Sequence, residues 1–351
     1  MSSHPIPIID FAPFLDGSAK QQVADQLLGS FKSAGFVYLT NFGLSNEEVQ
    51  EMFDWSKRFF ALPHESKMLA PHPGSGMHHR GYSFPGQEKE TQLPDSGDSA
   101  AEAEVPIPSV KESFDIGREE DDLMPNIWPP DHILPGFKES CLAFYWKCYE
   151  VEKNILRALA LGFGLEEEWF VRYHGMPDNG LRLQHYPSIA LESVLTNKVA
   201  RIATHTDFDT LTVLFPDSVG SLEIEDPNES GRFLAVSPIP NSIIVNAGDF
   251  LRRCEGSFGL AGTIYSYQCV DLTSVGSNDI IRSTMHRVRA PPNPVTKDGM
   301  LPDRYSIPYF CAADFSTVVD PIPGTWSADY PKKYEPVSVK EYVMKRFAAD
   351  Y

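Results

Sequence analysis

Two histidines and one aspartate have the types and the spacing of a metal-binding site. His205 and Asp207 lie two residues apart in the fragment His-Thr-Asp. Side chains at positions i and i+2 of a strand point to the same face, so this imidazole and carboxylate would converge on one point. His286 is the candidate third ligand, from a neighbouring strand. Two histidines and one carboxylate leave open positions on a metal ion, which favours a non-haem Fe(II) site that binds O2 beside a co-substrate.

A second group of residues has the chemistry of a carboxylate-binding site. Arg304 and Ser306 are again two residues apart in a β-rich run. A buried guanidinium binds a carboxylate through two hydrogen bonds, and a hydroxyl beside it adds a third. Tyr186, which precedes a proline, could offer its phenol to the same anion. The sequence therefore predicts an anion site near the metal ligands.

The elements that must position these residues change in kind along the chain. The first half carries helical patterns at 23–34, 45–62 and 136–164, with a short strand predicted at 36–39. From residue 181 onward, β-rich runs alternate with Pro, Gly, Asp and Asn turns; they lie at 181–186, 211–215, 222–225, 242–246, 282–286 and 305–310. Short strands without intervening helices predict an antiparallel barrel or jelly roll. Helices of the first half would pack on its outside, which gives an α+β fold.

Composition limits the partners of this chain. Its 351 residues hold 30 basic and 48 acidic side chains, for a net charge of −18. This charge argues against nucleic acid or an anionic membrane as a partner and favours a small-molecule substrate. Neither a bilayer-spanning apolar run nor a secretory leader is evident at the start, and the five cysteines form no CxxC pair. We therefore expect a cytoplasmic protein with reduced thiols.

One segment differs from the rest in charge. Residues 86–122 hold twelve acidic and three basic side chains, which is half of the net charge. Within it, the Pro-, Ser- and Ala-containing stretch 92–109 is typical of a solvated surface loop. The alternative is a lid beside the active site.

Eight motifs follow one another in the order expected of a known family; they lie at 5–11, 35–39, 80–82, 183–187, 205–207, 245–249, 286–288 and 304–306. With these motifs the chain resembles the 2-oxoglutarate- and Fe(II)-dependent dioxygenases of the isopenicillin N synthase-like family, over nearly its whole length. The resemblance implies a double-stranded β-helix (jelly-roll) core flanked by helices. It implies that His205, Asp207 and His286 bind iron, and that the co-substrate carboxylate binds at Arg304, Ser306 and Tyr186.

The resemblance also divides the chain into four segments. These are an N-terminal non-haem dioxygenase region at 1–120 with the acidic loop 92–109, a helical spine at 121–176, a jelly-roll domain at 177–325 and a C-terminal helix and tail at 326–351.

The chain departs from the family between the motif at 245–249 and the distal histidine. Relatives have a much shorter connection there, and residues 255–276 account for the excess. We hypothesise that this segment is a retained intron of the gene prediction; the alternative is a genuine surface loop. A mature transcript that still encodes it would exclude the intron.

By this resemblance the protein oxidises a small organic molecule by hydroxylation, desaturation or ring closure, with release of succinate and CO2. Its cofactors would be Fe(II), 2-oxoglutarate and O2, with ascorbate as a reductant. The candidate substrate residues are Arg182, Tyr82, Phe84, Phe208 and Phe310. Residues 80–89 resemble fungal members, including thymine 7-hydroxylase-like enzymes, and we favour secondary-metabolite biosynthesis. The alternatives are a nucleobase hydroxylase, an iron oxidase without 2-oxoglutarate, a zinc hydrolase and an inactive binding protein. Substrate identity and oligomeric state do not follow from these residues.

Overall fold

The structure is a computed structural model. The residues that it describes are 4–88, 110–196, 198–199, 201–252, 280–291, 294, 298–319, 321–332 and 336–347. The predicted acidic loop 92–109 and the suspected insertion 255–276 lie outside them. No helix within these ranges is long and apolar enough to cross a membrane. The three cysteines that they include are buried and form no disulfide: Cys141, Cys148 and Cys311.

Helices lie mainly in the first half of the chain. They are α1 (Ala12–Leu15), α2 (Lys20–Ser33), α3 (Asn46–Phe60), α4 (His64–Lys67), α5 (Phe137–Gly162), α6 (Leu191–Leu195) and α7 (Val339–Phe347), with a 3-10 turn at Val171–Tyr173. Strands dominate the second half. They are β1 (Ile8–Asp10), β2 (Phe36–Thr40), β3 (Gly81–Ser83), β4 (Glu112–Ile116), β5 (Gly180–Tyr186), β6 (Ile189–Ala190), β7 (Ile202–His205), β8 (Leu211–Pro216), β9 (Leu222–Asp226), β10 (Glu229–Val236), β11 (Ser242–Ala247), β12 (His286–Val288), β13 (Met300–Leu301), β14 (Arg304–Cys311), β15 (Val318–Val319) and β16 (Val337–Ser338).

Local sequence signals explain where the long helices begin and end. The Ser45 hydroxyl accepts from the Glu48 amide, and the Glu48 carboxylate accepts from the Ser45 amide, so a capping box opens α3. Gly35 follows the end of α2 with a φ of +71°, a left-handed conformation that glycine adopts at low cost. The same glycine lets the chain pass close to the segment before β12, because a Cβ there would meet the Arg282 carbonyl oxygen at 2.5 Å.

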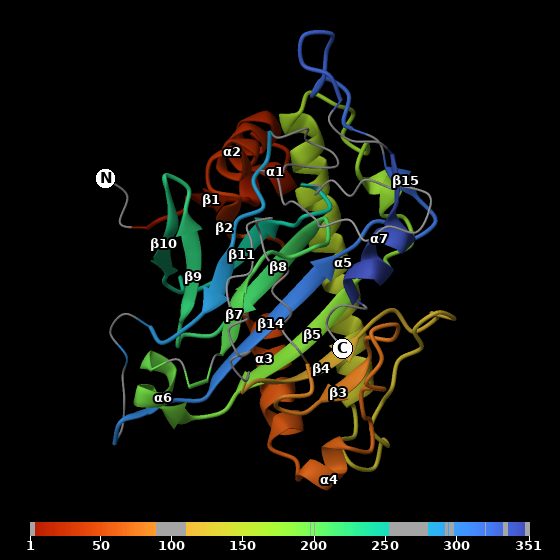
Figure 1. Cartoon of the computed structure of the whole chain (residues 1–351). Helices are drawn as coiled ribbons and strands as arrows, with labels where there is room; N and C mark the ends of the chain where they lie inside the picture. The colour runs from red at the N-terminus through yellow and green to blue at the C-terminus, as the bar shows by residue number, and fades with distance from the viewer. Residues whose placement is uncertain are drawn as a thin grey trace, which may run out of the picture.

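Eight strands form the main sheet, in the order β1-β2-β11-β8-β14-β5-β4-β3. Except for the parallel pair β1 and β2, its neighbours are antiparallel. The four central strands come from the second half of the chain, and two strands from the N-terminal half flank them on each side. Helices α3 and α5 pack against this sheet, and α2 packs on α5 (Figure 1). The largest buried apolar cluster includes residues of these helices and of the sheet.

A second sheet has the strand order β10-β9-β12-β7. A smaller apolar cluster joins its β9 and β10 to β2 and β11 of the main sheet, through residues such as Phe36, Ile224 and Ile244. Two facing antiparallel sheets with helices packed outside confirm the predicted α+β jelly roll.

One predicted element differs in the structure, and one strand was not predicted. The run 282–286 is not a strand: β12 begins at His286, where pairing with β7 and β9 starts. The charged segment 86–122 contains the buried strand β4, whose carboxylates are paired inside the protein. The segment boundaries at 120, 176 and 325 stay predictions.

Candidate metal centre and active site

His205, Asp207 and His286 come together in the structure. His286, the first residue of β12, is paired across the sheet with His205, the last residue of β7. The sequence suggested that Asp207 lies in the same strand as His205. In the structure Asp207 lies just beyond the end of β7. Its Oδ1 is 3.7 Å from His205 Nε2 and 3.6 Å from His286 Nε2. One ligand atom from each residue lies within 4.8 Å of the others, so the three could bind one metal ion.

Backbone carbonyls orient both imidazoles. His205 Nδ1 lies 2.9 Å from the Ala203 carbonyl oxygen, and His286 Nδ1 lies 3.1 Å from that of Thr284. A ring nitrogen beside a carbonyl oxygen carries the proton, which leaves the other nitrogen as a lone-pair donor. Both Nε2 atoms are therefore available to a metal.

The Asp207 carboxylate is held by its other oxygen. Oδ2 accepts hydrogen bonds from Thr212 Oγ1 at 2.6 Å and from Asn246 Nδ2 at 2.8 Å, while Oδ1 faces the histidines. Burial alone would raise the pKa of Asp207, but the two imidazoles and the Thr212 hydroxyl lower it well below its usual range. A deprotonated, oriented carboxylate beside two imidazoles fits a divalent iron ion.

Asp249 connects this centre to its surroundings. It accepts from Thr206 Oγ1 at 2.7 Å and from Ser283 Oγ at 2.9 Å, and Arg346 of α7 lies 3.6 Å away. Thr206, which lies between His205 and Asp207, the segment that leads to His286 and the C-terminal helix thus share one carboxylate, which fixes their relative positions.

The residues of the predicted anion site also lie together in the structure. The Arg304 guanidinium is buried; its Nε donates to the Gly220 carbonyl at 2.7 Å and its Nη1 to Ser306 Oγ at 3.2 Å. It lies over the Tyr186 ring, with Cζ 4.7 Å from the centroid. No described residue forms an ion pair with Arg304. A buried cation without a carboxylate is costly, so an anionic ligand would stabilise this arrangement.

Two further residues lie beside the predicted anion site. Gln184 is within the motif 183–187 but was given no role there, and Arg201 is in none of the motifs. Gln184 Oε1 accepts from Ser306 Oγ at 3.1 Å and from Tyr186 OH at 3.0 Å. Arg201 is fully buried, and its Nη2 donates to the Pro302 carbonyl at 2.8 Å. Burial and the positive charge of Arg304 lower the pKa of Arg201 to about 10. The site therefore holds two buried guanidiniums in one electrostatic neighbourhood.

A cavity with an empty volume of about 790 Å³ opens beside the Asp207 carboxylate. Of the candidate substrate residues, Arg182, Phe208 and Phe310 line it. Tyr82 and Phe84 do not. Tyr82 is buried with its hydroxyl 2.5 Å from Glu112 Oε2, and Phe84 lines a separate small pocket.

The C-terminal helix α7 forms one wall of the cavity. The Phe347 ring stacks on His79, with centroids 4.0 Å apart, and meets Phe208 edge-on at 5.3 Å. Val343 of the same helix also lines the cavity. Burial lowers the pKa of His79 to about 3, so this ring is neutral at physiological pH. Apolar and uncharged groups therefore face each other here.

The charged residues of another wall neutralise one another. Arg182 Nε lies 2.5 Å from Asp115 Oδ1, and Arg182 Nη2 lies 2.9 Å from Glu88 Oε1. Lys111 Nζ lies 2.8 Å from Glu88 Oε2. Two cations and two carboxylates thus form a neutral cluster, and the side chain of Arg182 also approaches the Phe310 ring.

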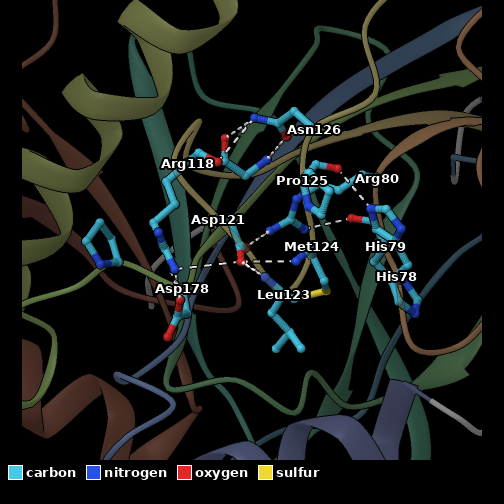
Figure 2. A network of polar contacts seen from close by, with 12 residues as sticks. His78, His79, Arg80, Arg118, Asp121, Leu123, Met124, Pro125, Asn126 and Asp178 are labelled. Atoms are coloured by element: carbon cyan, nitrogen blue, oxygen red, sulfur yellow. Dashed lines mark hydrogen bonds and ion pairs between the residues drawn. The ribbon is translucent and has the colours of Figure 1, made fainter.

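A second buried charge network supports the next part of the wall. Figure 2 shows Arg80 and Arg118 approaching the Asp121 carboxylate from two sides, at 3.3 Å and 3.7 Å, with Arg118 also 3.3 Å from Asp178 Oδ1. Asp121 Oδ1 in addition accepts the amides of residues 123 and 124. Arg80 lies so close to Gly117 that a Cβ on that glycine would be 2.1 Å from Arg80 Nη2. The network fixes the loop after β4 against the cavity.

Sequence reasoning missed Thr212 and Asn246, which orient the Asp207 carboxylate through hydrogen bonds to its Oδ2. Asn246 lies in a motif that the resemblance had included, but without a role. Strand alternation predicts which face each residue occupies within its own strand. Only the β8–β11 register places Thr212 opposite Asn246, so that both reach Asp207. Alternation with Tyr186 along the strand places Gln184 on the same face as that tyrosine, whereas nothing in the local sequence signals Arg201.

Comparisons with known proteins match both halves of the chain. Residues 6–131 match the family described as "non-haem dioxygenase in morphine synthesis N-terminal", and residues 177–313 match the "2OG-Fe(II) oxygenase superfamily". A 2-oxoglutarate-Fe(II) type oxidoreductase, ppzD of Metarhizium rileyi, is 36% identical over 346 residues, which are 98% of this chain and 90% of that protein. The chain belongs to the 2-oxoglutarate–Fe(II) oxygenase superfamily.

Other members of the superfamily align with nearly the whole length of this chain. Proline hydroxylase buaE of Petromyces alliaceus is 33% identical over 347 residues, 98% of each chain. The crystal structure of a full-length Neurospora crassa protein in complex with alpha-KG, which is 2-oxoglutarate, superposes with a TM-score of 0.83 at 36% identity and covers 100% of both chains. The same protein with alpha-KG and thymine gives 0.82 at 37% identity, over 99% of this chain and 97% of that one. This oxygenase therefore uses Fe(II), 2-oxoglutarate and O2, as the resemblance predicted.

Proposed function

We propose that His205, Asp207 and His286 bind the Fe(II) of this oxygenase through both Nε2 atoms and Asp207 Oδ1. The donor set supports this assignment, because two neutral imidazoles and one carboxylate are the facial triad of non-haem iron enzymes. Bound iron would supply the activation of O2 and the oxidation of a substrate C–H bond, coupled to conversion of 2-oxoglutarate to succinate and CO2. Thr212 and Asn246 would keep Oδ1 directed at the metal.

We propose that Arg304 and Ser306 bind the distal carboxylate of 2-oxoglutarate, with Tyr186 beside them. The observation that supports this best is the buried Arg304 guanidinium, which forms no ion pair with any described residue. An incoming carboxylate would neutralise this charge. The charge of Arg201 would add to the attraction.

The substrate would bind in the cavity beside Asp207. Its aromatic lining, Phe208, Phe310 and Phe347, supports a small organic molecule with a flat or apolar surface. The sequence suggested that Arg182 binds a polar or acidic substrate. In the structure its charge is matched by Glu88 and Asp115, which favours a polar contact over an ion pair with the substrate.

The substrate class that we propose is an intermediate of secondary-metabolite biosynthesis. Full-length fungal relatives named as oxidoreductases and as a proline hydroxylase support it. The alternative is a nucleobase, because the similar Neurospora crassa structure contains thymine. A cytoplasmic location and ascorbate as reductant complete the proposal.

Two measurements test it. Deletion of the gene should cause the substrate to accumulate, and its identification by mass spectrometry distinguishes a secondary metabolite from a nucleobase. The purified protein should convert that compound only with Fe(II), O2 and 2-oxoglutarate, with release of succinate. Product formation without succinate would show an oxidase that does not use 2-oxoglutarate, and no turnover at all would show an inactive binding protein.

A further inference from the structure

Gln184 lies between the residues of the anion site. The β5–β14 register places Gln184 opposite Ser306 and Tyr186 opposite Arg304. The side chain of Gln184 is nearly buried, and its Oε1 is the shared acceptor for the Ser306 and Tyr186 hydroxyls. One amide oxygen thus holds two of the three groups that would bind the co-substrate carboxylate.

Counting protons shows a conflict in this arrangement. Each hydroxyl has one proton, and both protons point at Gln184 Oε1. Ser306 Oγ meanwhile accepts from Arg304 Nη1 at 3.2 Å. A carboxylate is only an acceptor, so it gains nothing from a hydroxyl whose proton is used elsewhere. In this arrangement Arg304 is the one of these three groups that could donate to the anion.

Rotation of the Gln184 amide by half a turn removes the conflict. The NH2 group has two protons, so it could donate to the oxygens of both Ser306 and Tyr186 from the position that Oε1 occupies. Both hydroxyl protons would then be available to a ligand. Nε2 forms no hydrogen bond with a described residue that would oppose this rotation, and the two hydroxyls keep a partner in either state.

We propose that Gln184 is a positioning residue whose amide turns over when 2-oxoglutarate binds, redirecting the Ser306 and Tyr186 protons from Oε1 to the distal carboxylate. In the empty protein the amide oxygen satisfies the hydroxyls. In the loaded protein the amide nitrogen holds their oxygens in place. The inference rests on the proposed role of Arg304 and Ser306 in binding this carboxylate.

Calorimetric titration of the Fe(II)-loaded protein with 2-oxoglutarate, without O2, tests the inference through binding rather than turnover. Gln184→Met keeps the length of the side chain and removes the amide. We expect its Kd for 2-oxoglutarate to rise roughly tenfold, because the amide no longer holds the Ser306 and Tyr186 hydroxyls in place and both must be ordered when the ligand binds. The hydrogen bonds to Gln184 itself are lost from the empty and the loaded protein alike. Gln184→Glu should bind more weakly still, since its carboxylate accepts both protons permanently and repels the ligand. Oxalate has no distal arm, so its Kd should not change.

The critical result is whether Gln184→Met raises or lowers the Kd for 2-oxoglutarate. If Gln184 only competed for the hydroxyl protons, Gln184→Met would bind 2-oxoglutarate as tightly as the wild type or more tightly, and the inference would be wrong. An equal loss for oxalate would also overturn it, because the damage would then be general. Gln50→Met, on the exposed face of α3, is the matched control. Failure of the wild type to bind 2-oxoglutarate would instead refute the proposed function.

A double-mutant cycle adds an independent readout. In a Ser306→Ala background one of the two hydroxyls is gone, so the effect of Gln184→Met should shrink by several-fold. An unchanged effect would show that Gln184 does not act through Ser306, which contradicts the inference.

Discussion

Replacing Asn246 by alanine removes one of the two hydrogen bonds that orient Asp207. The lost bond joins Asn246 Nδ2 to Asp207 Oδ2 over 2.8 Å, and both residues are buried. A hydrogen bond to a charged group contributes about 1.5–3 kcal/mol. Thr212 still holds the same oxygen, so the carboxylate stays nearby but is free to rotate. We expect Fe(II) affinity to fall about 10- to 100-fold, the range typical of residues that orient a metal ligand.

The assay is anaerobic calorimetric titration of the metal-free protein with Fe(II), together with thermal unfolding to confirm that the variant is folded. Asn228→Ala is the matched control, because its side chain also bonds to an aspartate, Asp226, but in an exposed turn and not to a candidate ligand. Thr212→Val should weaken binding as well. Its effect and that of Asn246→Ala should not add, since both donors share one acceptor.

The reasoning is refuted if folded Asn246→Ala binds Fe(II) within about twofold of the wild type, because the lost bond would then contribute too little to orient Asp207. A loss in the Asn228→Ala control as large as that in Asn246→Ala would point to a general effect on the fold.

Three further predictions concern stability. Burial raises the pKa of Glu152 well above its usual value, so the folded protein keeps a proton that the unfolded chain releases, and stability falls as pH rises. The thermal midpoint of Glu152→Gln should therefore rise relative to that of the wild type as the pH is raised from about 5 to about 8. Gly117→Ala should lower the free energy of unfolding in denaturant by about 1–3 kcal/mol, because the new methyl group collides with Arg80. Deletion of 255–276 should leave a folded protein that binds Fe(II), because described residues on the two sides of this segment already contact each other, as in the hydrogen bond from Arg252 to the Ser283 carbonyl.

Each of these has a clear contrary outcome. A Glu152→Gln difference that does not vary with pH would contradict a protonated Glu152. Gly29→Ala, in α2 with open space around its Cβ position, is the control for Gly117→Ala, and equal effects of the two would exclude the collision. A deletion variant that fails to fold would support a genuine structural role for 255–276.

The sequence could single out His205 and Asp207 because their spacing is local, whereas His286 lies far along the chain and only the β7–β12 register places it beside them. Residues i and i+2 beside a strand need only the strand's own geometry to converge, and the capping box that opens α3 is likewise complete within four residues. Arg304 and Ser306 followed from the same alternation.

Pairing between distant segments limited the rest. The net charge of 86–122 gave no sign of a buried strand, yet Glu112 and Asp115 of β4 are buried against Lys67 and Arg182. The aromatic ring of Tyr82 suggested a substrate contact, but its hydroxyl bonds to Glu112. Composition reports charge without showing which charges are matched, and only the folded register supplies that match.

The order of strands in the main sheet has a consequence for how the chain is made. During synthesis β1 and β2 emerge first, but their partner β11 ends at Ala247, more than two hundred residues later. Strand β4, which pairs with β3, likewise emerges before its other partner β5. Contacts between such distant segments form slowly, and unpaired strand edges attract other chains. The N-terminal region expressed alone should therefore aggregate, because the edges of β2 and β4 lack their partners β11 and β5.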